Sequence, residues 1–294
     1  MEGMAIKSLI LNECEYAEEL LQNGLCGEKP YRAISILSKY FYHKKKMRKK
    51  DISFELHDFL AKFYKAYRME KFQWGETIEK LLSNVQKSTL YEIPGVRITK
   101  PEMERIQDLD NEKLERVAFV MLCIAKLNDL KSAKNNGWVN TDVKEIFTLA
   151  RVSARVNERF VILGKLEEQG LIEFPKKNGN LNNRITFIQE DADEVLFVSD
   201  FRELGYEYQR YCGENICGCP ECGILFRGNR QHNQRYCQNC SPRTKRIDKP
   251  VICEDCGKQF FVSALNSKST RCHSCYMEYR RLRKLESQRN RRVE

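Results

Sequence analysis

Apolar residues in the first 98 positions recur every three to four residues and predict helices. The predicted runs are 9–21, 31–42, 52–63 and 77–85. Pro30 suits the first turn of the second helix, Asp51 is placed to cap the third, and Gly75 precedes the fourth. Val96–Ile98 is typical of a short strand. We therefore interpret residues 1–98 as a helical N-terminal domain.

From Thr99 onward, helical spacing alternates with short strand-like runs. Thr99 and Glu102 have the spacing of a capping box. The next helix carries an apolar face made of Leu114, Val117, Ala118, Met121, Leu122 and Ala125. A short strand is expected at Trp138–Asn140, and Asn140 or Thr141 can cap the helix that follows it.

A further helix is expected to start after Ser153, which can cap it, and to end before Gly170. Its expected core positions are Val156, Phe160, Leu163 and Leu166. Two strands, 171–174 and 184–188, follow this helix. The dipeptide Asn178-Gly179 between them is a hairpin signal.

Helix, strand, helix, helix and hairpin follow one another in the order of a winged helix. The tripeptide Gly170-Leu171-Ile172 is similar to the sequence that usually leads into that family's wing. Residues 99–190 therefore resemble winged helix-turn-helix proteins, which implies DNA contact through the third helix or the wing. The outward side of the third helix is not strongly basic, whereas the wing carries Lys176, Lys177 and Arg184. We favour the wing for DNA, with protein contact as the alternative.

Ten of the 13 cysteines lie between Cys212 and Cys275. Two paired motifs, Cys219/Cys222 with Cys237/Cys240 and Cys253/Cys256 with Cys272/Cys275, start 34 residues apart. In each, a glycine follows the second cysteine (Gly223, Gly257) and a phenylalanine comes three residues later (Phe226, Phe260). Such spacing favours metal ligands over disulfides.

These eight cysteines resemble tandem four-cysteine zinc ribbons and predict two structural Zn²⁺ ions. Four thiolates leave no open coordination position, so a catalytic metal is disfavoured. Cys212 or Cys217 can replace one ligand of the first site, although the repeat favours Cys219. His232 and His273 are weaker alternatives. Cys14, Cys26 and Cys123 fall in helical patterns and are expected in cores.

Charge is concentrated at the C-terminal end. Residues 201–294 contain 19 of the 51 basic and 10 of the 41 acidic side chains, so the first 200 residues are almost neutral. Two filled zinc sites would lower the formal charge of +10 to about +6, because each Zn(Cys)₄ group carries −2. The remaining basic excess favours a polyanionic partner.

The expected nucleic-acid contacts are basic residues of the wing, the first ribbon and the C-terminal segment. They are Lys176, Lys177, Arg184, Arg227, Arg230, Arg235, Arg280, Arg281, Arg283, Lys284, Arg289, Arg291 and Arg292. DNA is favoured over RNA. A second interpretation is an adaptor that binds a polymerase or replisome subunit. With four histidines and no glycine-rich phosphate loop, the sequence does not indicate an enzyme.

The expected fold is mainly α. Its parts are a helical domain (1–98), a winged-helix α+β domain (99–190), a connector (191–210), tandem zinc ribbons (211–276) and a basic helix or tail (277–294). This arrangement resembles accessory proteins of bacterial phages and mobile elements. No membrane span or secretory signal is evident in the sequence, so we expect a cytoplasmic protein without a membrane partner.

Overall fold

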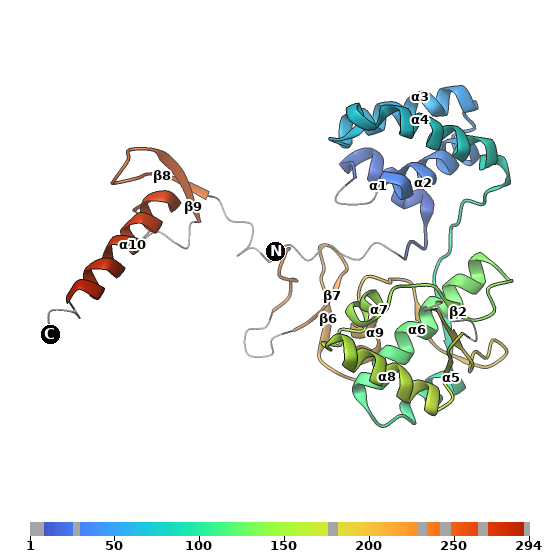
Figure 1. Ribbon diagram of the computed structural model, residues 1–294. Helices are drawn as coiled ribbons and strands as arrows, with labels where there is room; N and C mark the ends of the chain where they lie inside the picture. Colours follow the sequence, from blue (N-terminus) through green and yellow to red (C-terminus); the bar gives the residue numbers. More distant parts are fainter. Residues whose placement is uncertain are drawn as a thin grey trace. The chain divides into compact units, whose positions relative to one another are not determined.

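The computed structural model describes residues 9–25, 30–175, 182–228, 234–241, 248–263 and 270–290 (Figure 1). Its contacts divide the chain into two compact units, residues 1–216 and 217–294. Helices and small antiparallel sheets together give an α+β structure. Among the described residues, no helix is both long and apolar enough to cross a bilayer.

The N-terminal helices share one apolar core. They are α1 (Glu13–Asn23), α2 (Pro30–His43), α3 (Lys49–Phe63) and α4 (Tyr67–Asn84), followed by a short 3₁₀ turn, η1 (Val85–Lys87). Leu37, Leu56 and Ile78 are among its fully buried side chains. Cys14 is also buried, as expected, whereas Cys26 lies outside the described residues.

Two helix starts in this region were predicted wrongly. Arg48, not Asp51, is the residue before α3, and its Nε lies 2.8 Å from Asp51 Oδ2 inside the first turn. Gly75 is inside α4, which begins at Tyr67. No atom lies within 4 Å of a Cβ built at Gly75, so this glycine costs α4 only its low helix propensity. Burial of Tyr67, Ile78 and Leu82 outweighs that cost.

The remainder of the first unit begins with β1 (Val96–Thr99), α5 (Lys100–Gln107) and α6 (Glu112–Lys131). It continues with β2 (Trp138–Val139), α7 (Val143–Leu149), α8 (Val156–Glu168), β3 (Ile172–Glu173) and β4 (Asn183–Ile185). The strands β2, β4 and β3 form an antiparallel sheet in that order. The Asn178-Gly179 turn lies outside the described residues.

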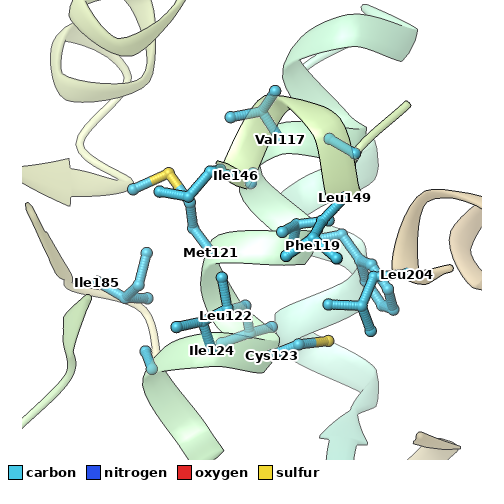
Figure 2. Close-up of a cluster of buried hydrophobic side chains, with 14 of the residues drawn as sticks. Val117, Phe119, Met121, Leu122, Cys123, Ile124, Ile146, Leu149, Ile185 and Leu204 are labelled. Carbon is cyan, nitrogen blue, oxygen red and sulfur yellow. The ribbon is translucent and has the colours of Figure 1, made fainter. Parts of the chain in front are cut away.

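Helix α6 is the centre of this second core (Figure 2). The predicted face is buried, but so are Phe119, Val120 and Ile124 on its other sides. The extra cover comes from the segment 191–210, which forms β5 (Glu194–Val198) and leads into α9 (Leu204–Tyr211). β5 pairs with β1, and the ring of Tyr208 in α9 lies 5.3 Å from that of Phe119.

The starts of α7 and α8 differ from the prediction. Asp142 caps α7 by accepting from the backbone N–H of Lys144 at 2.8 Å, and Arg155 is the N-cap residue of α8. Of the four α8 positions expected to be buried, Leu163 and Leu166 are, but Val156 and Phe160 are 61 % and 51 % exposed. The predicted residues do lie on one side of α8, but only the second half of that side is buried in the core.

The described residues of the second unit form two small hairpins and a helix. The first hairpin is β6 (Ile216–Gly218) with β7 (Leu225–Arg227), and the second is β8 (Asp248–Ile252) with β9 (Gln259–Ser263). β8 and β9 are antiparallel, with Val251 opposite Phe260. Helix α10 (His273–Asn290) follows the second hairpin.

Candidate metal centres

The eight cysteines of the sequence repeat form two groups of four. Cys219, Cys222, Cys237 and Cys240 make one, and Cys253, Cys256, Cys272 and Cys275 make the other. Within each group the four Sγ atoms lie within 4.8 Å of one another. The first pair of each group lies in the turn between the two strands of a hairpin. The second pair comes from a turn in the first centre and from the start of α10 in the second.

The sulfur separations fit tetrahedral metal coordination. Cys222 Sγ and Cys237 Sγ are 3.7 Å apart, and so are Cys256 Sγ and Cys272 Sγ. Metal–sulfur bonds of about 2.3 Å in a tetrahedron place sulfurs about 3.8 Å apart, whereas a disulfide needs about 2.05 Å. None of the eight cysteines forms a disulfide. Each group can therefore hold one metal ion.

Both centres are built on the same backbone turn. Gly223 and Gly257 each have φ of +70°, a conformation that favours glycine. The N–H of Gly223 donates to Cys219 O at 2.8 Å, and that of Gly257 donates to Cys253 O at 2.9 Å. This tight turn brings two thiols, three positions apart, to one point. The repeated sequence therefore forms the same backbone turn in both centres.

The second pair of each centre also repeats. The N–H groups of Ser241 and Tyr276 donate to the carbonyl oxygens of Cys237 and Cys272, both at 2.9 Å. In the first centre this bond closes a turn, whereas in the second it is part of the start of α10. Cys275 therefore lies in the first turn of a helix, so a metal ion there would fix the helix to its hairpin.

In each centre, hydrogen bonds from backbone N–H groups lower the pKa of one cysteine and so stabilise its thiolate. Burial raises the pKa of Cys219, but the N–H groups of Cys237, Cys222 and Glu221 outweigh it and lower the pKa to about 6. The N–H of Cys272, 3.3 Å from Cys253 Sγ, is the main reason why the pKa of Cys253 is also about 6. At neutral pH both sulfurs are mostly thiolates, the form that binds metal.

In the last cysteine of each group the thiol pKa is raised instead of lowered. Hydrogen bonding with Cys222 raises the pKa of Cys240, and hydrogen bonding with Cys272 raises that of Cys275. Sulfurs this close cannot all lose their protons unless a cation balances the charge. A divalent ion supplies that balance, so the arrangement favours metal binding over four independent thiols.

The alternative ligands lie outside these groups. Cys212 follows α9 and Cys217 is in β6, and the structure groups neither with the four sulfurs of the first centre. His273 is exposed at the start of α10 and also belongs to neither group, whereas His232 lies outside the described residues.

The residues predicted to contact nucleic acid are only partly described. Arg227, Arg235, Arg280, Arg281, Arg283 and Lys284 are exposed, the last four on α10. Lys176, Lys177, Arg230, Arg291 and Arg292, together with the side chain of Arg289, lie outside the described part. The Arg184 guanidinium is 3.2 Å from Glu173 Oε2 and also donates to Asn136 O at 3.1 Å, so it is already engaged within the chain.

Sequence reasoning missed a link between the second centre and α10. Arg271 Nε lies 2.7 Å from Asp255 Oδ2, and the Arg271 guanidinium carbon lies 4.5 Å from the centre of the Tyr279 ring. Asp255 is between two cysteines of the centre, and Arg271 directly precedes a third. The position of Arg271 next to the ligand Cys272 was visible in the sequence. Its contacts with Asp255 and Tyr279 were not, because they form only when the turn is folded.

Comparison with known proteins found no match: no family model fits the chain, and no curated protein or solved structure is similar to it.

Proposed function

We propose that this chain is a non-enzymatic, zinc-containing nucleic-acid-binding protein, with DNA as its favoured partner. The observation that carries the proposal is the second cysteine centre, which gives rise to a helix displaying Arg280, Arg281, Arg283 and Lys284 to solvent. Zinc is the proposed metal because it prefers tetrahedral thiolate sites, and the four sulfurs that would surround each ion support a structural role.

The electrostatics of α10 support a phosphate contact. Between His273 and Lys284 the only acidic residue is Glu278, and its Oε2 lies 3.8 Å from the guanidinium of Arg281. The remaining cations are available to neutralise phosphates and release counterions. Contacts of this kind bind the backbone rather than read bases, so we expect low sequence specificity.

We further propose that residues 112–185 act as a winged helix. The element order from α6 to β4 and the strand order β2-β4-β3 support this proposal. A role in replication or transcription of a phage or mobile element remains a proposal from the resemblance in domain organisation.

One observation favours the adaptor as a second candidate function. Val156, Phe160 and Val161 expose large apolar side chains on α8, the helix that would enter the major groove. Exposed apolar residues of this size suit a protein partner better than a phosphate backbone. A polymerase or replisome subunit bound through α8 would use this surface.

The experiment for the leading proposal is a salt series with a labelled DNA duplex and the full chain. The logarithm of the affinity should fall linearly with the logarithm of the salt concentration. Replacing Arg280, Arg283 and Lys284 by Gln should reduce the slope by about 2 to 3. A matched control replaces the exposed residues Lys65, Lys71 and Lys80 by Gln, which removes the same charge from the N-terminal helical region.

Equal losses in the two triple variants would show that net charge alone governs binding and would contradict the assignment to α10. If the chain bound neither DNA nor RNA in a salt-dependent way, the proposed function would be wrong. The adaptor would then be favoured, and Phe160→Asp should abolish its protein contact.

A further inference from the structure

Two tyrosine rings are accessible on α10, the helix whose first turn contains the metal ligand Cys275. Tyr276 and Tyr279 are 48 % and 38 % exposed. Tyr276 directly follows the metal ligand Cys275, and its backbone N–H donates to Cys272 O at 2.9 Å. The position of this part of α10 is therefore tied to the metal centre.

The tyrosines share one side of α10 with two arginines. At 100° per residue, Tyr276, Tyr279, Arg280 and Arg283 fall within a sector of about 100°; we call this the tyrosine–arginine face. Glu278, the acidic residue of this part of the helix, projects to the other side, where it pairs with Arg281. Along this face two aromatic rings are followed by two cations, and none of the four residues is acidic.

The Tyr279 ring is held in place before any ligand arrives. The guanidinium carbons of Arg271 and Arg283 lie 4.5 Å and 5.8 Å from its centre. Arg271 is itself fixed by Asp255, between the first two cysteines of the centre. A ring oriented in this way loses little conformational freedom when a planar ligand stacks on it.

We propose that the tyrosine–arginine face is a binding site for single-stranded nucleic acid. This inference rests on the proposed nucleic-acid-binding function and specifies the form of the partner. Unpaired bases stack on Tyr276 and Tyr279, while Arg280 and Arg283 neutralise the adjoining phosphates. A duplex buries its base faces in its own stack, so it engages only the cations of this face.

An anionic membrane surface is the rival partner for a basic helix with exposed apolar residues. Helices that lie on membranes separate their apolar residues from their cations on opposite faces. Here Tyr276 and Tyr279 share one face of the helix with Arg280 and Arg283. That mixture suits a chain of alternating bases and phosphates better than a layered bilayer surface.

The test measures binding of the full chain to a labelled oligothymidylate and to a duplex of equal length. Tyr276→Ala should weaken binding to the single strand about 10-fold and change duplex binding less than twofold. Tyr276→Phe, which keeps the ring, should stay within about threefold of wild type for both. Each variant must retain two zinc ions per chain, which separates loss of stacking from loss of folding.

Anionic phosphatidylserine vesicles complete the set of probes. Vesicle binding without binding to the single strand would overturn the inference in favour of a membrane surface. An equal effect of Tyr276→Ala on single strand and duplex, or no effect on either, would also overturn it while leaving the proposed function intact. If wild type bound no nucleic acid at all, both proposals would fail.

Discussion

Lys126 Nζ lies 2.9 Å from Glu102 Oε1 inside the core of the first unit. Both side chains are almost inaccessible, at 3 % and 0 % exposure. Glu102 also accepts hydrogen bonds from the backbone N–H groups of Thr99 and Gln189, each at 2.8 Å. One carboxylate therefore joins the start of α5, the middle of α6 and the chain that leads to β5.

Replacing this carboxylate should destabilise the first unit strongly. Glu102→Gln leaves the Lys126 ammonium buried without its main counter-charge, which should cost about 3 kcal/mol of unfolding free energy. Urea unfolding in a Trp74→Phe background measures this, because Trp138 in β2 then reports on this core. The control is Glu104→Gln, two residues further along α5, where the exposed pair with Lys100 spans 3.8 Å. The control should lose less than about 0.5 kcal/mol; similar losses in both variants would show that the buried pair has no special weight.

The N-terminal helices should lose stability as the pH falls. His57 Nδ1 lies 2.7 Å from the hydroxyl of Tyr67, and burial lowers the pKa of His57 below 6.5. Between 6.5 and that lower value the unfolded chain binds more protons than the folded one, so the free energy of unfolding decreases as the pH decreases. Urea unfolding from pH 7 to pH 5, with Trp74 as reporter in a Trp138→Phe background, should show this slope.

The comparison for this slope is His57→Gln, which removes the titrating ring. The variant should lose the part of the pH dependence that lies just below pH 6.5. If wild type and variant gave parallel curves throughout this range, His57 would not be the responsible group.

Residue spacing and turn chemistry predicted which helices and strands form better than they predicted where these elements begin or how deeply they are buried. The strand at 96–98, the capping-box pair Thr99/Glu102 and the helices α2 and α6 follow from spacing and turn chemistry. The exposure of Val156 and Phe160 does not follow, because periodicity shows which residues share a face but not how far the core extends beneath it. Full burial of α6 likewise depends on α9, which lies about 80 to 90 residues later in the chain.

The cysteine groups were more predictable because metal ligands obey a strict short-range geometry. Two intervening residues and a glycine after the second cysteine define the turn, whatever surrounds it. The contacts of Arg271 were not predictable, since Asp255 and Tyr279 approach it only when both halves of the centre come together.

The glycine in this turn offers a graded test of the second centre. No atom lies within 4 Å of a Cβ built at Gly257, so alanine meets no clash, but φ of +70° strains it by about 1 kcal/mol. Gly257→Ala should therefore weaken metal binding at this centre about fivefold, measured by competition with a coloured chelator. Gly218→Ala, beside a ligand of the first centre but without positive φ, should leave both affinities unchanged. Equal weakening in the two variants would mean that flexibility next to a ligand matters, rather than the left-handed turn.

Metal content should distinguish the grouped cysteines from their neighbours. Wild type should carry two zinc ions per chain, and Cys253→Ser should carry one, because a hydroxyl does not replace the thiolate that the N–H of Cys272 stabilises. Cys217→Ser is the matched control: Cys217 lies two positions before the ligand Cys219 but outside both groups, so this variant should keep two ions. Elemental analysis after gel filtration gives the count. Loss of one ion from Cys217→Ser would transfer a ligand role to that residue, since the two sulfurs next to Gly218 compete for the same position in the first centre.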